Sequence, residues 1–193
     1  MKLSHKIIKK LFTKFFKFKI FVYGKILSNT SIVCGKATIN QPTLFLGTGQ
    51  INIADCVSFG YNPSPFFYSG YMHIEARGKT SIVEIGENTY INNSATIISE
   101  GAKISIGKDC LIGPNFTCFD SDFHRIEPHL RLTAPTPKSV TIGDNVFIGA
   151  SVTILKGVSI GKNCVVGGGS VVTKSFPDNC VIVGSPARVV KML

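Results

Sequence analysis

The chain has 193 residues, enough for one principal domain with its own core. Its composition, 44% hydrophobic and 17% charged with 19 glycines, excludes a disordered chain and argues against a helical bundle. Residues 1–54 carry nine lysines and no acid, so they hold nearly all of the net charge of +10. The remaining residues therefore have no basic surplus for a nucleic-acid-binding face.

Residues 1–30 form a basic segment whose apolar residues recur at helical spacing. Paired Ile, Leu or Phe side chains at 7–8, 11–12 and 15–16 alternate with lysines, which predicts an amphipathic helix over residues 3–22. No apolar run reaches the roughly 18 residues that cross a bilayer. Two uses remain open for residues 1–22: peripheral contact with an anionic membrane, and packing against the main domain or another subunit. Nucleic-acid binding is a third alternative, and we expect no such partner.

Residues 63–71, PSPFFYSGY, are rich in aromatic side chains. Aromatic faces stack well on sugar rings, so this stretch is a candidate for the wall of a saccharide site. Packing in the core or in a subunit interface is the alternative.

A repeat of six residues dominates the second half of the chain. Between residues 142 and 177 an aliphatic side chain stands at every sixth position, often before glycine, and a small or branched residue follows four positions later. The aliphatic series is Ile142, Ile148, Ile154, Ile160, Val166 and Val172. The same unit occurs upstream over residues 85–97 and, in a new phase, over 106–118.

A period of six fits neither an amphipathic helix nor a long alternating strand. It predicts an all-β solenoid of very short parallel strands, in which three hexapeptides complete one triangular coil and coils stack about 4.8 Å apart. We expect this solenoid over residues 31–186 and a C-terminal cap over residues 187–193.

The six cysteines have no CxxC pair and no spacing typical of a zinc module. The first residues lack a cleavable signal pattern, so we expect small, buried, reduced thiols in the cytoplasm. Cys110 and Cys164 each follow a repeat aliphatic by four residues, which predicts core positions and not catalytic thiols.

The repeat breaks between residues 119 and 139. Ile106 and Ile142 are 36 residues apart, which equals two coils, yet residues 119–139 have no period and contain three prolines. Because proline disfavours a central strand, we expect a loop that projects from the coils. Such excursions commonly carry function on a rigid scaffold.

His124 in this loop is the candidate catalytic base. It stands near Asp120 and Asp122, and an imidazole oriented by an acid or by a backbone carbonyl suits removal of a proton from a sugar hydroxyl. The alternative is a solvated loop histidine, which is our interpretation of His129.

Residues 167–174, GGGSVVTK, and 183–188, VGSPAR, give the last repeats a specific signature. Through them the chain resembles the hexapeptide-repeat acyltransferases, in particular the sugar acetyltransferase branch that includes galactoside and maltose acetyltransferases. The resemblance is strong over residues 85–193 and loose over 31–84, and it implies a left-handed parallel β-helix. It also implies acetyl transfer from acetyl-CoA to a saccharide hydroxyl, in surface polysaccharide or glycan biosynthesis, by a homotrimer.

The same resemblance implies the site residues. Asp122–His124 falls where related enzymes keep their catalytic base, and the backbone N–H of Ala150 would stabilise the oxyanion. The acetyl-CoA groove, from a different subunit than His124, would be formed by Gly149, Ala150, Gly168, Thr173, Lys174, Arg188 and Lys191. Related enzymes place an asparagine near the acceptor, and its position here is Ser94, beside Asn92 and Asn93, which leaves the acceptor open.

Three alternatives remain for the function. N-acetylation of a nucleotide-linked amino sugar would use the same fold, and a non-enzymatic solenoid would only bind a partner. The third is a zinc carbonic anhydrase of β-helix type, suggested by the spacing of His124 and His129. A third ligand would have to be His73, which stands in an irregular stretch, so we expect acetyl-CoA as co-substrate and no metal.

Overall fold

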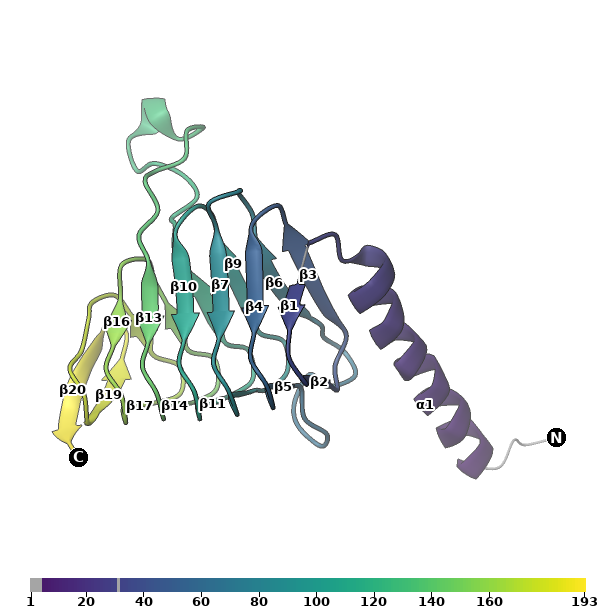
Figure 1. Cartoon of the computed structure of the whole chain (residues 1–193). Helices are drawn as coiled ribbons and strands as arrows, with labels where there is room; N and C mark the ends of the chain where they lie inside the picture. Colours follow the sequence, from purple (N-terminus) through teal and green to yellow (C-terminus); the bar gives the residue numbers. More distant parts are fainter. Residues whose placement is uncertain (1–4, 31) are drawn as a thin grey trace.

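The computed structural model describes residues 5–30 and 32–193. Residues 1–4 of the expected N-terminal segment and residue 31, the expected start of the solenoid, lie outside the described residues. The chain begins with α1 (His5–Phe21) and continues into the π-helical segment η1 (Val22–Leu27) at one end of the molecule (Figure 1). Within the described residues, neither helix combines the length and apolar character needed to cross a membrane.

In the described part of the chain twenty short strands follow, and they form three sheets that are the sides of one prism. The first sheet contains β1 (Ile32–Cys34), β4 (Gln50–Ile53), β7 (Ile82–Ile85), β10 (Lys103–Ile106), β13 (Val140–Ile142) and β16 (Ser159–Ile160). The second contains β2 (Thr38–Ile39), β5 (Ser58–Phe59), β8 (Tyr90–Ile91), β11 (Leu111–Ile112), β14 (Phe147–Ile148), β17 (Val165–Val166), β19 (Cys180–Gly184) and β20 (Ala187–Met192). The third contains β3 (Thr43–Gly47), β6 (Met72–Ala76), β9 (Thr96–Ser99), β12 (Thr117–Phe119), β15 (Thr153–Ile154) and β18 (Val171–Val172).

The repeat positions stack on one another along the prism. In the first sheet Ile85, Ile106, Ile142 and Ile160 occupy matching register positions, and all four are buried. The other two sheets stack their aliphatics in the same way, so the core is a continuous column of Ile and Val side chains. The expected parallel β-helix with an N-terminal helix is confirmed.

Asparagines at the corners between the sheets permit the sharp turns. Asn88, Asn115, Asn145 and Asn163 have φ between 54° and 60°, a left-handed conformation in which asparagine is favoured over branched residues. Two of them form a ladder, because Asn145 Nδ2 donates to Asn163 Oδ1 at 3.0 Å in the next coil. The corners therefore add side-chain hydrogen bonds to the backbone hydrogen bonds between coils.

The structure bears on three of the sequence expectations. The 36 residues from Ile106 to Ile142 form one coil and the expected projecting loop, because β10 pairs directly with β13. The coils begin at β1, so the irregular sequence before residue 85 is part of the solenoid, as expected. Cys34 and Cys56 are exposed, whereas the other four cysteines, Cys110 and Cys164 among them, are buried as predicted.

The two ends of the solenoid are covered differently. At the C-terminal end, residues 187–192 form β20, which pairs antiparallel with β19 and extends the second sheet. At the N-terminal end, the aromatic stretch packs against α1: the ring centroids of Phe16 and Phe67 lie 4.9 Å apart, and those of Phe12 and Tyr68 lie 5.1 Å apart. Most of the aromatic stretch thus supports the helix.

Candidate functional site

The projecting loop, residues 120–139, follows β12 and stands above the prism (Figure 1). Its two ends are joined where the Lys138 N–H donates to the Asp120 carbonyl at 2.8 Å. Near its tip, the short 3-10 helix η2 (Pro128–Leu130) tightens the turn. The loop is therefore closed at its base by a backbone hydrogen bond, which fixes its position on the coil.

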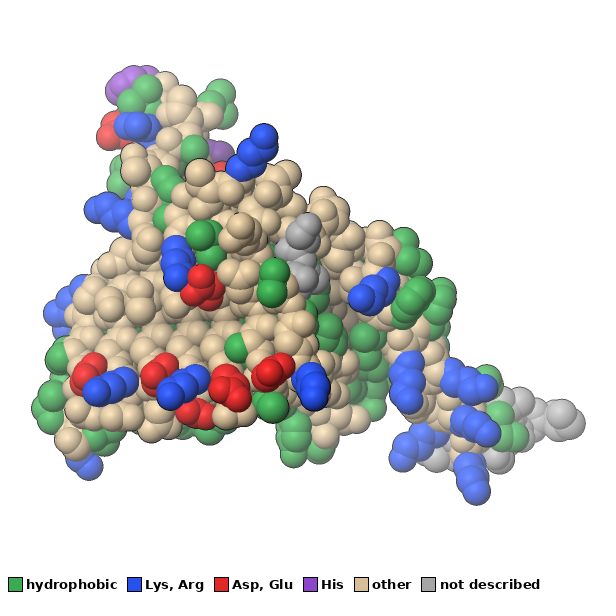
Figure 2. Space-filling model, viewed as in Figure 1, with side chains coloured by type: hydrophobic (Ala, Val, Ile, Leu, Met, Phe, Trp, Pro, Cys, Tyr) green, Lys and Arg blue, Asp and Glu red, His purple; other side chains and the backbone are tan. Residues whose placement is uncertain are grey.

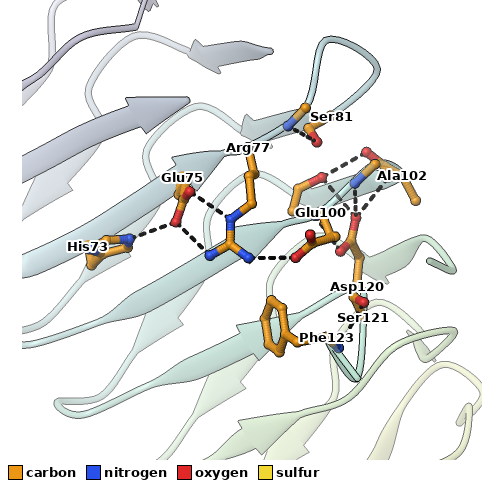
Figure 3. Close-up of polar contacts among 12 residues, drawn as sticks. His73, Glu75, Arg77, Ser81, Glu100, Ala102, Asp120, Ser121 and Phe123 are labelled. Carbon is orange, nitrogen blue, oxygen red and sulfur yellow. Dashed lines mark hydrogen bonds and ion pairs between the residues drawn. The ribbon is translucent and has the colours of Figure 1, made fainter. Parts of the chain in front are cut away.

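Asp120 anchors the base of the loop. Its carboxylate is fully buried and accepts hydrogen bonds from the backbone N–H groups of Glu100 at 2.7 Å and Ala102 at 2.9 Å (Figure 3). Ser99 Oγ lies 2.8 Å from the same carboxylate. These donors belong to the preceding coil, so Asp120 fixes the loop to the solenoid.

His124 is held in one orientation by the loop itself. Its Nδ1 lies 2.7 Å from the carbonyl oxygen of Arg131, seven residues further along the loop. Because a carbonyl only accepts, Nδ1 carries the proton of this hydrogen bond, and Nε2 of the neutral ring has a free lone pair. The preceding residue, Phe123, has a φ of 62°, which turns the backbone sharply at this point. The ring is exposed.

The sequence left two kinds of orienting group open, and neither nearby carboxylate contacts the His124 ring. Asp120 is engaged with the preceding coil, and Asp122 forms an ion pair with Lys156 Nζ at 2.5 Å. The orienting group is the Arg131 carbonyl, the other possibility that the sequence left open.

A polar network beside the loop was not predicted from the sequence. His73 and Glu75 on the outer face of β6 and Arg77, just after this strand, follow one another at every second position, and Arg77 also bonds Glu100 (Figure 3). The guanidinium Cζ of Arg77 lies 5.3 Å from the centroid of the Phe123 ring. The alternation of charged residues at 73, 75 and 77 was the available signal, since such residues share one face of a strand.

The same network perturbs two acid–base groups. The hydrogen bond from Arg77 lowers the pKa of Glu75, and the smaller effects of His73 act in the same direction against the cost of burial. Reciprocally, the hydrogen bond to Glu75 raises the pKa of Arg77. Phe123, next to the candidate base, thus rests on a guanidinium that stays charged.

Glycines line one corner of the last coils, after the strands of the second sheet. A Cβ built on Gly149 would lie 2.5 Å from the Gly168 nitrogen in the next coil, so only glycine permits this approach. Ala150 and Gly168 occupy equivalent positions in successive coils, directly after Gly149 and Gly167, and both are exposed. Within residues 5–30 and 32–193, no acceptor pairs with the N–H of Ala150 or of Gly168. The corner presents two free backbone donors to solvent.

The other residues predicted to bind acetyl-CoA are near the C-terminal end of the solenoid. Arg188 on β20 stands opposite Val183 on β19, and a Cβ on Gly167 would lie 2.6 Å from a methyl carbon of Val183. This places Arg188 beside the glycine corner. The remaining members of the set, Thr173, Lys174 and Lys191, are exposed.

The three residues predicted to contact the acceptor have different environments. Asn93 is fully buried, and its amide bonds the backbone of Tyr61 and Pro65, so its assignment to substrate binding is wrong. Asn92 accepts a hydrogen bond from the Asn93 N–H at 2.7 Å. Ser94 lines a cavity of about 410 Å³ on the outer face of the third sheet, together with Ser69, Gly70, Tyr71, His73, Thr96 and Ile98.

The buried thiols of Cys110, Cys118 and Cys180 do not offer a nucleophile. Burial raises the pKa of the Cys110 and Cys118 thiols, and burial with the neighbouring Cys164 raises the pKa of Cys180 to about 11. Neutral thiols are poor nucleophiles. His129 is exposed on η2, and the described part of the chain contains no cluster of three or more His, Cys, Asp or Glu side chains arranged to hold a metal ion.

Comparison with known proteins adds independent information. The family model described as "Hexapeptide repeat of succinyl-transferase" matches residues 103–118 and 139–174. The chain is 31% identical over 163 residues to the Escherichia coli K12 protein named "Putative lipopolysaccharide biosynthesis O-acetyl transferase WbbJ", covering 79% of this chain and 77% of that one. It is 43% identical over 108 residues to the galactoside O-acetyltransferase of Lactococcus lactis, covering 55% of this chain and 51% of that enzyme.

Several relatives are longer than the matched region: the chain spans about half the length of the first curated relatives that it matches. Among solved structures, a galactoside acetyltransferase in complex with coenzyme A superposes with a TM-score of 0.58 at 25% identity, covering all of this chain and 84% of that one.

Proposed function

The chain belongs to the hexapeptide-repeat acetyltransferase family, and on that premise we propose that it transfers an acetyl group from acetyl-CoA to a hydroxyl of a saccharide. The observation that carries the proposal is the state of His124, whose Nδ1 is held by the Arg131 carbonyl while Nε2 is free and exposed. This is the arrangement that a general base requires.

In the proposed reaction, His124 Nε2 removes the proton of the acceptor hydroxyl as its oxygen attacks the thioester carbonyl of acetyl-CoA. The tetrahedral oxyanion accepts a hydrogen bond from the Ala150 N–H, and the CoA thiolate then leaves and takes the proton from the imidazolium. The free donor of Gly168, in the next coil, fits the amide-rich pantetheine arm, and Arg188 and Lys191 fit the phosphates of CoA. No acyl-enzyme is needed, in keeping with thiols that stay protonated.

The cavity beside Ser94 is the proposed acceptor site. Tyr71 offers an aromatic face for a sugar ring, and Ser94, Thr96 and His73 offer hydrogen-bonding groups. The Arg77 network leads from His73 toward Phe123, next to the base. These groups support a saccharide acceptor, as in the enzymes that the chain resembles, and Ser94 is proposed to contact it.

The active assembly is proposed to be a homotrimer in which His124 of one subunit serves the glycine corner of another. Two large apolar side chains on the catalytic loop support this: Ile126 is 84% exposed and Leu132 is 98% exposed. Apolar groups on a projecting loop are well placed to be covered by a neighbouring subunit. The proposed location is the cytoplasm, with residues 1–22 touching the inner face of a membrane.

A thiol-release assay with acetyl-CoA and a panel of sugars, amino sugars included, tests the proposal. We expect His124→Ala to lower the rate by about 10²–10⁴-fold. His129→Ala is the matched control, because it removes an exposed histidine from the same loop and should leave the rate unchanged. Equal losses in both variants, or no thiol release by the wild type with any acceptor, would contradict the proposal. Turnover confined to amino sugars would indicate N-acetylation.

A further inference from the structure

The helix α1 is attached to the solenoid along a single stripe. Phe16 packs on Phe67 and Tyr68, and Phe12 packs on Tyr68, with ring centroids 4.9–5.2 Å apart. Among the side chains of residues 6–21, only Phe16 is buried. Docking against this chain's own solenoid therefore uses only part of the apolar surface of the helix.

A second apolar stripe runs along the same helix and remains at least half exposed. Large side chains recur at every third or fourth position, and each is at least half exposed: Ile7, Leu11, Phe15 and Phe18. At about 100° per residue, this stripe lies roughly 120° around the helix from the stripe of Phe12 and Phe16. It therefore points away from the solenoid.

The second stripe lies in a strongly cationic helix. Six lysines occur between residues 6 and 19, no acid occurs in the helix, and the first acid of the chain is Asp55. Figure 2 shows lysine side chains gathered on α1, which stands off from the main body of the molecule. Whatever covers the apolar stripe must tolerate this dense positive charge.

We propose that α1 lies on the surface of an anionic bilayer, with Ile7, Leu11, Phe15 and Phe18 among the acyl chains. A bilayer suits both properties of the helix, because the lysine stems can extend from the apolar stripe to lipid phosphates. A second copy of this chain suits them poorly, since another α1 would bring equal charge and residues 55–193 have one more base than acids. The neighbouring exposed rings of Tyr61, Phe66 and Tyr68 are of the type enriched at membrane interfaces.

Vesicle sedimentation of the full chain tests this docking. We expect binding to phosphatidylcholine vesicles containing about 30% phosphatidylglycerol to be at least tenfold tighter than to pure phosphatidylcholine, and to weaken with added salt. Phe15→Glu should weaken binding at least tenfold without unfolding the protein, because Phe15 is 62% exposed. Lys10→Gln with Lys14→Gln should weaken it by about 25-fold, at about fivefold for each lysine.

Val190→Glu is the matched control, since Val190 is also an exposed apolar residue, 59% exposed, at the other end of the chain. It should bind vesicles like the wild type. Unchanged vesicle binding by Phe15→Glu would overturn the proposal. A lower mass of Phe15→Glu in light scattering would also overturn it, because Phe15 would then lie in a subunit interface. The docking and the acetyl transfer fail separately: thiol release with soluble sugars should be the same in Phe15→Glu and wild type, whatever the vesicles show.

Discussion

Replacing Asp120 with asparagine should destabilise the protein far more than it changes the chemistry. The buried carboxylate accepts from Glu100 N–H on one oxygen and from Ala102 N–H on the other. An amide has only one acceptor oxygen, so in either orientation its NH2 group faces a backbone donor. One buried donor is left unpaired and the remaining bonds lose their charge, which together cost about 2–4 kcal/mol of unfolding free energy.

Denaturant unfolding at fixed protein concentration measures this loss, and Asp122→Asn is the matched control. Asp122 lies two residues away and its side chain is 40% exposed in its ion pair with Lys156, so its loss should cost at most about 1 kcal/mol. Below its unfolding transition, Asp120→Asn should retain more acetyl transfer than His124→Ala. If Asp120→Asn unfolds at the wild-type midpoint and yet loses activity as fully as His124→Ala, Asp120 belongs to the chemistry and the reasoning fails.

Three further predictions concern the assembly, the glycine corner and the polar network. Leu132→Glu should lower the mass seen by light scattering from that of a trimer, and an unchanged mass would place Leu132 outside the interface. Gly149→Ala should cost about 1–3 kcal/mol of unfolding free energy, because its Cβ meets the next coil. Gly168→Ala should fold normally and raise KM for acetyl-CoA. Equal stability of the two variants in thermal unfolding would contradict this. Because the pKa of Glu75 is lowered in the folded protein, its carboxylate adds stability above the pKa of glutamate in the unfolded chain, about 4.3. This stability is lost as the pH falls through the folded pKa. Between pH 7 and pH 3.5, the unfolding free energy of Glu75→Gln, measured by urea titration, should therefore fall less than that of the wild type, by up to about 1 kcal/mol.

The coils were predictable because, in a solenoid, residues that contact one another between coils are separated by a short, regular distance in the sequence. Ile142 and Ile160 are neighbours in space since they are one coil apart in the chain, and the period reveals this directly. For the 36 residues after Ile106 the count alone would give two coils, and the missing period with its prolines is what indicated the loop. A period counts residues and does not distinguish a coil from an excursion of equal length.

The roles of the polar residues were less predictable, because their partners are a coil or more away. Asp120 is next to the loop histidine in sequence, yet it bonds residues 100 and 102 of the preceding coil. Asn93 bonds backbone groups of residues 61 and 65, about thirty positions upstream. Their positions in the chain, near His124 and Ser94, suggested catalysis for Asp120 and substrate binding for Asn93. Because both side chains are buried and fully hydrogen-bonded, their roles are structural.

The position of the proposed acetyl-CoA site follows from what occupies the same corner in each coil. In the second and third coils, the equivalent backbone N–H groups, of Tyr61 and Asn93, are bonded by the side chains of Asn93 and Asn92. In the fourth coil the residue is Pro114, which has no N–H. Only in the fifth and sixth coils, at Ala150 and Gly168, does the described structure leave this donor exposed and unpaired. A repeating scaffold thus presents one place where a thioester oxyanion and an amide-rich arm would both find donors, and it is the place where glycine packing keeps side chains away.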